Sequence, residues 1–412
     1  MATIFWDPKA LAVAQVDTVQ VTAFHADTTY TLTVNGIALI AVAGVTNVTA
    51  TALAMVTAWN LLTHPYATGI TASNDAGVIT LTADTAGEPN TVTSSKSGTG
   101  TIGSVTSVTA ATGPNDWNNA LNFSGGAIPV NTNDVVIDNT SVSILFGLNQ
   151  SGMSGTLASL TIGAGFTGKI GLNRNKFLTN GAEATNAGEY RPDYLQVEVV
   201  GVISISDDSG SGVTQKSQRL KIDNGANAGT FRIFSSAVLE NSADAPRPPV
   251  QLLSASASST VEASNGFIGV AVAVPGETAT FGTINTSGAR IVTGKGLTLT
   301  SFIQSAGPGS SLRAAGTVTT VTINGGSLET SGSFAITTLN SSGGEVICNS
   351  TGTITNLNST GGRFNFIKSK EARTVTNTKI DPGGSIAYDP AVVTLTNKIT
   401  SNVAVNYAAT SV

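Results

Sequence analysis

Thr317–Gly352 reads TVTTVTINGGSLETSG followed by SFAITTLNSSGGEVICNSTG, and this stretch decides the fold because its pattern repeats. Four glycines mark the repeat at intervals of 18 residues: Gly307, Gly325, Gly343 and Gly361. A short, fixed period is the sequence signature of a solenoid, in which each repeat stacks on the one before it. The spacing therefore predicts a stacked architecture.

Each repeat carries two apolar positions around its glycine. The first set lies four residues before the glycines, at Ile303, Val321, Leu339 and Leu357, and the second follows them at Leu312, Leu328, Val346 and Phe364. Val, Ile and Thr alternate between turns of Asn, Ser and Gly, which favours short strands over helices. We therefore predict a parallel β-helix with turns of roughly 18–22 residues and one continuous apolar core.

The composition fits a β structure with a polar, weakly charged surface. Only 11% of the 412 residues are charged, against about 25% in an ordinary soluble domain. The net charge is −5 and no basic stripe is visible, so nucleic acid is not an expected partner. The longest apolar run, Phe267–Val274, is too short to cross a bilayer, and the N-terminus has no secretory signal pattern.

Residues 1–15 form a short N-terminal arm with too little context to fold alone. It contains Ile4, Phe5 and Trp6. Apolar and aromatic residues on a free arm dock either on the same protein or on a neighbour. These three side chains are therefore candidate partner contacts.

The sequence pattern over residues 16–110 predicts a small α+β domain with the order ββαββ. Strand-like alternation over 18–24 and 29–40 includes Asn35-Gly36, a strong hairpin signal. Apolar residues then recur at helical spacing over 45–62, and two more strands are expected at 68–73 and 77–83.

Several residues of this small domain have predicted structural roles. Thr46 and Asn47 are the candidate N-caps of the helix, and Met55 and Trp59 are assigned to the domain core. Asn74-Asp75 is expected to join the last two strands.

The remaining sequence divides into a cap and the solenoid. Residues 111–133 are expected to form a linker and a solenoid cap, in which Trp117 and Phe123 cover the open apolar end of the first turn. Residues 134–412 form the predicted β-helix, with loop insertions at 173–193 and 244–249. Loops that leave a solenoid commonly carry its partner contacts. The candidate contact residues there are Arg174, Lys176, Tyr190, Arg191 and Arg247.

The sequence offers little support for catalysis, and we expect neither a cofactor nor a metal. The two histidines, His25 and His64, lie in no Cys/His/Asp cluster, and His64 is expected to be solvated or to cap a helix. Cys348 is expected to point inward as a small hydrophobe. Gly98–Gly103 matches GxGxxG, but a strand pattern follows it where a dinucleotide fingerprint requires a helix.

Paired carboxylates keep a glycosidase open as an alternative, because β-helix enzymes that cut polysaccharides place two or three acids on one face. The candidate pairs are Asp207 with Asp208, Asp134 with Asp138, and Glu183 with Glu189. Asp207-Asp208 precedes Ser-Gly-Ser-Gly, which indicates a solvated turn. No Arg, His or Tyr stands next to Asp134 or Asp138 to complete a site.

Several motifs carry a family resemblance. TYTLTVNG, the helix after it and GVITLTADTAGEPNTVTSS resemble a small module of tailed-bacteriophage virion proteins. The continuation GPNDWNNALNFSGGAIPVNTNDVVID, with GKIGL and YRPDYLQV later, is similar to phage and prophage proteins in which that module precedes a β-helix. The resemblance covers most of the chain, its motifs are structural, and it implies no catalytic set. The pattern W…NFSGG…P is also similar to the start of the β-helix in secreted bacterial adhesins.

The expected function is that of a non-catalytic virion structural protein assembled in the host cytoplasm. A capsid decoration or cement protein is the leading hypothesis, acting as a homotrimer bound to the major capsid protein or other virion proteins. A tail fibre or receptor-binding spike that recognises a host glycan is the alternative. A polysaccharide-degrading spike and a bacterial adhesin follow it.

Overall fold

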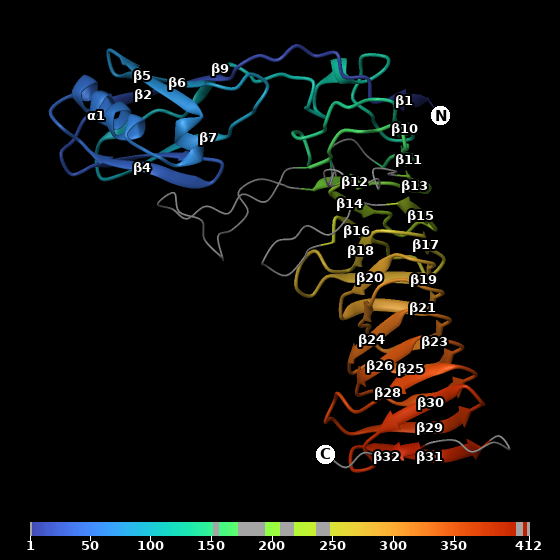
Figure 1. Cartoon of the computed structure of the whole chain (residues 1–412). Coiled ribbons are helices and arrows are strands. Elements are labelled where there is room, and N and C mark those ends of the chain that lie inside the picture. Colours follow the sequence, from blue (N-terminus) through green and yellow to red (C-terminus); the bar gives the residue numbers. More distant parts are fainter. Residues whose placement is uncertain are drawn as a thin grey trace.

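A computed structural model describes residues 2–150, 156–171, 194–206, 218–235, 248–400 and 407–409. Strands account for 52% of the chain and helices for 6%. Parallel strands stack into a long solenoid, and a small α+β domain lies beside its N-terminal end (Figure 1). The predicted mainly β fold is confirmed, with a solenoid of about seven turns over residues 250–398.

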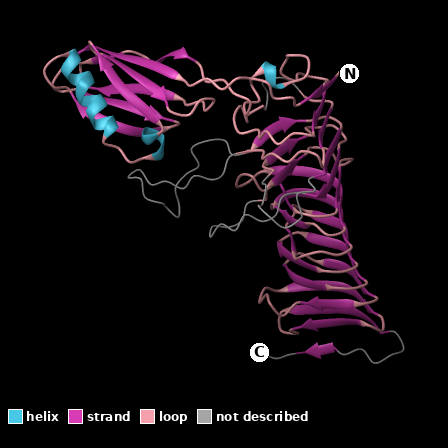
Figure 2. Cartoon of the chain, turned by 45° about the horizontal axis from the view of Figure 1, so that its top comes forward, coloured by secondary structure: helices cyan, strands magenta, loops and turns pink. Residues whose placement is uncertain are grey.

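Two parallel sheets form the solenoid, and from β12 onward the chain alternates between them (Figure 2). The longer sheet contains β1 (Thr3–Phe5), β10 (Asp134–Ile137), β11 (Ser159–Ile162), β13 (Val202–Ser206), β15 (Thr230–Ser235), β17 (Thr260–Ala263), β19 (Thr278–Thr286), β21 (Gly296–Gln304), β23 (Thr317–Ile323), β25 (Ala335–Ser341), β27 (Ile354–Ser359), β29 (Arg373–Ile380) and β31 (Val393–Thr400). The second sheet contains β12 (Leu195–Glu198), β14 (Leu220–Asp223), β16 (Val250–Leu253), β18 (Phe267–Val270), β20 (Arg290–Thr293), β22 (Ser310–Leu312), β24 (Ser327–Gly332), β26 (Glu345–Ser350), β28 (Gly362–Asn365), β30 (Gly384–Tyr388) and β32 (Tyr407–Ala409).

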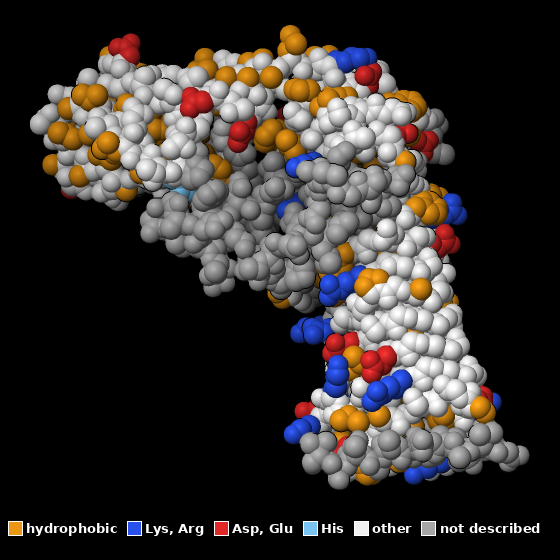
Figure 3. All heavy atoms as spheres, in the orientation of Figure 1, with side chains coloured by type: hydrophobic (Ala, Val, Ile, Leu, Met, Phe, Trp, Pro, Cys, Tyr) orange, Lys and Arg blue, Asp and Glu red, His pale blue; other side chains and the backbone are white. Residues whose placement is uncertain are grey.

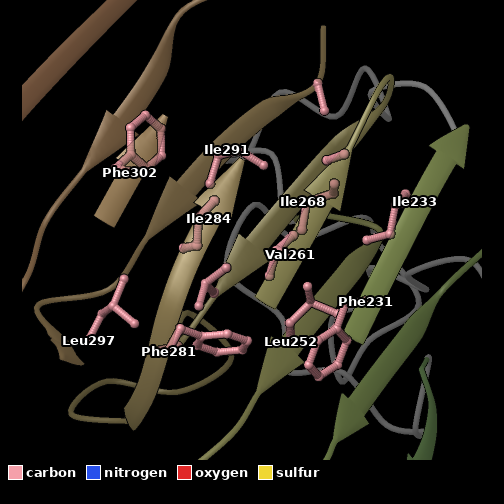
Figure 4. Packing of buried hydrophobic residues seen from close by; sticks show 14 of the residues in the cluster. Phe231, Ile233, Leu252, Val261, Ile268, Phe281, Ile284, Ile291, Leu297 and Phe302 are labelled. Atoms are coloured by element: carbon pink, nitrogen blue, oxygen red, sulfur yellow. The ribbon is translucent and has the colours of Figure 1, made fainter. Parts of the chain in front are cut away.

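Apolar side chains point inward in register from one turn to the next. One fully buried column of the longer sheet runs through Val135, Leu160, Ile203, Phe231, Val261, Ile284, Phe302, Val321, Leu339 and Leu357. Figure 4 shows part of this column gathered in one core with Leu252 and Ile268 of the second sheet. The 18-residue count is wrong at Ile303, because Ser301 pairs with Thr320 and this 19-residue turn puts Phe302 in the column instead.

In the double-glycine turns both glycines lie against the preceding turn, and the second also has a positive φ. Gly326 and Gly344 have φ of +75° and +74°, a conformation that glycine adopts without steric cost. The glycine before each of them lies against the preceding turn: a Cβ on Gly343 would stand 2.5 Å from the carbonyl oxygen of Asn324. The glycines of the repeat therefore lie where successive turns come into contact.

The longer sheet bends where two consecutive residues both point away from the core. In β25, Thr337 and Thr338 lie in this way between the buried Ile336 and Leu339. Side chains at the bend hydrogen-bond along the stack in the last turns. The Nδ2 of Asn377 donates to Oδ1 of Asn356, and the Nδ2 of Asn397 donates to Oδ1 of Asn377, both at 2.9 Å. Such side-chain ladders help to keep stacked strands flat.

The small domain contains more strands than the predicted ββαββ order. Its elements are β2 (Val16–Ala23), β3 (Thr29–Val34), β4 (Ile37–Ala43), α1 (Val48–Asn60), α2 (Pro65–Thr68), β5 (Ile70–Asp75), β6 (Val78–Ala83), β7 (Val92–Ser97), β8 (Thr101–Ile102) and β9 (Thr106–Thr109). One sheet has the order β5-β6-β2 with β8 and β9 also on β2, and the other has the order β4-β3-β7. The added strands are short and polar, so their sequences resembled loops.

The helix and the first hairpin of this domain lie where the sequence placed them. Asn47 is the N-cap of α1, since its side chain accepts from the Ala50 amide at 2.8 Å, and Met55 and Trp59 are buried. Asn35-Gly36 forms the β3–β4 turn with positive φ at both residues. The predicted turn at Asn74-Asp75 is wrong by two residues, because Ala76-Gly77 has the positive φ values instead.

The N-terminal arm is a strand of the solenoid. Thr3, Ile4 and Phe5 pair in parallel with Asp134, Val135 and Val136 of β10. The small domain is therefore inserted between the first and second strands of the longer sheet. Of the two docking sites expected for the arm over residues 1–15, its first half uses the one on the same protein, since backbone hydrogen bonds to β10 hold it in the sheet.

Candidate functional site

Three aromatic side chains close the N-terminal end of the solenoid. Trp6 and Trp117 stack with their ring centroids 6.2 Å apart, and Phe123 meets each of them edge-on at 5.1 Å. All three are buried, and Trp6 is only 2% exposed. We call Trp6, Trp117 and Phe123 the N-terminal cap. Trp6 was a predicted partner contact, but its ring packs against other side chains of the same chain.

Asn122 joins the segments that carry this cap. Its Nδ2 donates to the carbonyl oxygens of Gly113 and Asp116, both at 2.8 Å, and its Oδ1 accepts from the Ala10 amide at 3.1 Å. The side chain is fully buried, at the end of the 3-10 turn Ala120–Asn122. Burial raises the pKa of the neighbouring Asp116 carboxyl, and a hydrogen bond from the Asn118 amide opposes that shift.

Exposed apolar side chains surround the closed end. Phe5 is 50% exposed and Leu11 82%, and Leu121 and Val130 are also exposed. Apolar side chains are visible in this region of Figure 3. Of the three predicted contacts over residues 4–6, Ile4 is partly buried against the core and Phe5 alone stays largely accessible.

Two adjacent segments connect the small domain to the solenoid. Val13 and Thr112 form an antiparallel bridge, with the Val13 amide donating to the Thr112 carbonyl at 2.8 Å. The Gly87 amide donates to the Val13 carbonyl at 3.0 Å, and Gly113 packs closely on Gly87. The small domain is therefore anchored at both of its ends next to the N-terminal cap.

The predicted contacts in the two loop insertions lie outside the described residues. These are Arg174, Lys176, Tyr190 and Arg191 in the 173–193 insertion and Arg247 in the 244–249 insertion. Two proposed carboxylate pairs, Asp207 with Asp208 and Glu183 with Glu189, lie outside them as well.

The remaining carboxylate pair is engaged in local structure. An Asp134 carboxylate oxygen accepts from the Ser159 hydroxyl at 2.6 Å, and Asp138 accepts from the Asn139 amide at 2.8 Å. Gly163 and Gly165 both pack against Asp138. In the part of the chain that the structure describes, no group of three or more His, Cys, Asp or Glu could hold a metal ion.

The histidines and the cysteine have separate environments. His25 lies 2.5 Å from the Asp27 carboxylate at an exposed turn. His64 accepts from the Tyr66 amide at 3.2 Å at the start of α2, a short helix that the sequence did not predict; it is buried rather than solvated, and burial lowers its pKa. Cys348 is fully buried, as predicted, and burial raises its pKa to about 12.

The GxGxxG match at Gly98–Gly103 is followed by β9, as the strand pattern predicted, so no helix is present to hold a pyrophosphate. Within the described ranges, no helix is both long and apolar enough to span a membrane. The chain matches no protein-family profile, and no curated protein matches it.

Proposed function

We propose that the chain is a non-catalytic structural protein of a tailed-bacteriophage virion and that it decorates the capsid. One observation carries the proposal beyond the sequence resemblance. Of the twelve large hydrophobic side chains that are exposed among the described residues, nine lie between Phe5 and Val130, before the second strand of the longer sheet, and three lie along the solenoid, at Val202, Phe234 and Val274. Side chains of this kind at one end of an elongated protein suit attachment there, because burying them against a partner is favourable.

In this proposal the N-terminal end attaches and the C-terminal turns project. Phe5, Leu11, Leu121 and Val130 around the N-terminal cap, together with the small domain, contact the major capsid protein or another virion protein. The solenoid is a stiff spacer because each turn is hydrogen-bonded to the next along both sheets. A homotrimer on a symmetric shell position multiplies modest contacts through multivalency.

Copy number in purified virions tests this function. A decoration protein is present in numbers comparable with the symmetric positions of the shell, as measured by quantitative mass spectrometry against the major capsid protein. Absence from the particles overturns the proposal. Sedimentation of the purified protein tests the homotrimer separately.

Rebinding to particles that lack the protein tests the attachment surface. We expect Leu121→Ser to weaken rebinding. Val274→Ser, a similar change at an exposed apolar residue farther along the solenoid, is the matched control and leaves rebinding unchanged. Equal weakening by both variants rules out attachment through the N-terminal end.

The same orientation, with the N-terminal end attached and the C-terminal turns projecting, suits a tail fibre or receptor-binding spike, which is the second candidate. The projecting turns then present hydroxyl and amide side chains to a host glycan. A few copies per virion, instead of shell-like numbers, together with binding to host cells, favour this candidate over capsid decoration.

A further inference from the structure

One outer surface of the longer sheet carries a regular array of threonines. From β21 to β31, successive turns repeat the pattern Thr-X-Thr around one inward residue. The array contains Thr298 and Thr300, Thr317 and Thr319, Thr337, Thr353 and Thr355, Thr374 and Thr376, and Thr394 and Thr396. In β25, Ala335 takes the place of the first threonine. We call this set the threonine face.

The inward residues between the threonines align the turns. Val318 pairs with Ile336, Ile336 with Ile354, Ile354 with Val375, and Val375 with Leu395. Between β21 and β23 the paired residues begin at Ser301 with Thr320, and before them the Ala315 amide donates to the Leu297 carbonyl at 2.7 Å in a different register, so the aligned columns begin at β23. Since residues on either side of an inward residue point outward, the threonines form two parallel columns.

The hydroxyls of this face are available to bind an occupant. Every threonine of the face is exposed or partly exposed, and within the described residues none of their hydroxyls hydrogen-bonds to another protein group. The bend beside the face differs, because Asn356, Asn377 and Asn397 bond to one another there. The threonine columns therefore present a repeat of unpaired hydroxyl and methyl groups.

Charge is absent from the two columns, whereas Lys379 and Lys398 stand outward near the ends of β29 and β31 and further charges stand on the other sheet. Glu329, Glu345 and Arg363 stand outward on β24, β26 and β28, and the last two form an ion pair. Figure 3 shows charged side chains over this part of the solenoid beside a broad uncharged flank. A charged occupant would find no complementary group among the threonines.

The spacing of the array matches the lattice of hydrogen-bonded water. Adjacent strands lie about 4.8 Å apart, and outward residues two apart on a strand are separated by about 6.6 Å. In tetrahedral water with a hydrogen bond of about 2.75 Å, oxygens that share a neighbour are about 4.5 Å apart, and the hexagonal axis repeats at about 7.3 Å. The mismatch of about 0.3 Å per turn accumulates to about 1.2 Å over the four steps from β23 to β31, and the two columns lie about 0.7 Å closer together than the repeat of the hexagonal axis. All turns therefore face the same lattice rows.

We propose that the threonine face binds ice, with the hydroxyls joining the water lattice and the methyl groups occupying the spaces between its rows. A second copy of the chain is a poorer occupant. Five aligned turns by two columns cover an area of about 20 Å by 10 Å, well below the roughly 800 Å² per partner of a stable protein interface. The inference is independent of the proposed virion function.

Ice-affinity uptake of the full chain tests the proposal, with inhibition of ice recrystallisation as a second readout. The wild-type protein is expected to concentrate in the growing ice, and Thr355→Lys to weaken uptake by about tenfold or more because a hydrated charge then separates the face from the lattice. Ser311→Lys, which adds the same charge on the other sheet, is the matched control and should behave as wild type.

Three results would overturn the proposal. They are exclusion of the wild-type protein from ice, equal loss in Thr355→Lys and Ser311→Lys, and an oligomer that Thr355→Lys dissociates. The third result would assign the face to a second copy of the chain. Circular dichroism of each variant establishes that the fold is retained, and Thr355→Ser, which keeps the hydroxyl, supplies a milder variant if the lysine variant unfolds.

Discussion

Replacing Trp6 with alanine should open the N-terminal end of the solenoid without unfolding the rest. The ring is buried, contacts both Trp117 and Phe123, and donates from Nε1 to the Val142 carbonyl at 3.2 Å. Truncation of a buried tryptophan to alanine costs about 3–5 kcal/mol. The two aromatic contacts account for about 0.5–1.5 kcal/mol each beyond the buried area, and the hydrogen bond for about 1 kcal/mol.

This loss should remain local because turns of a solenoid interact only with their neighbours. Amide hydrogen exchange measures it turn by turn. The Gly163 amide, which donates to the Ile137 carbonyl at 2.8 Å near the cap, should exchange roughly 100-fold to 4,000-fold faster in Trp6→Ala, since about 1.4 kcal/mol is a factor of ten. The Glu345 amide, which donates to Gly326 far along the solenoid at 3.0 Å, should not change.

Phe5→Ala is the matched control for this experiment. Phe5 is the next residue in the chain and is half exposed, so its truncation should cost about 1 kcal/mol or less. Equal acceleration at Gly163 and Glu345 would show that the solenoid opens as a single unit. Equal effects of Phe5→Ala and Trp6→Ala would refute the assignment of the cap to the buried ring.

Three further predictions concern single residues. Gly344→Ala should destabilise the solenoid by more than the roughly 1–2 kcal/mol that a left-handed residue costs, because the alanine Cβ would also stand 2.3 Å from the Gly326 carbonyl oxygen. Gly332→Ala is the control, since Gly332 has a positive φ but open space around it, and thermal unfolding of the two variants measures the difference. Cys348 should resist thiol reagents at pH 8 until the protein is unfolded, since burial raises its pKa to about 12; rapid labelling of the native protein would contradict its inward position. Hydrogen bonds, the strongest from the Thr99 amide, lower the pKa of Asp27 to about 2. The contact with Thr99 should therefore be complete above pH 4 and be lost as the pH falls through 2. An NMR titration of the Asp27 carboxyl measures this midpoint, and a normal value near 4 would exclude the contact.

The sequence predicted the features that depend on neighbours in the chain or on a strict repeat. The glycine spacing predicted the stack, Asn47 and the spacing of Met55 and Trp59 predicted the helix, and Asn35-Gly36 predicted the hairpin. Each of these signals lies within a short stretch of sequence, because helix caps and tight turns are closed by local hydrogen bonds.

The threonine face shows the limit of such patterns. The Thr-X-Thr pairs are visible in the sequence, but turns of unequal length separate them. Ser301 pairs with Thr320, 19 residues on, whereas Thr317 pairs with Ala335, 18 residues on. A single period cannot bring the pairs into register, and the pairing of inward residues such as Val318 with Ile336 does so in the folded solenoid.

By itself, the sequence determined that this protein is a stack of short strands with a small helix-containing domain before it. Only the tertiary structure decided that the first strand belongs to the stack and that the small domain is an insertion in it. Ile4 pairs with Val135 across the whole of that domain, and Trp6 completes a cap with Trp117 and Phe123. No local pattern encodes these contacts, because the open apolar end of a solenoid forms only once its turns have stacked.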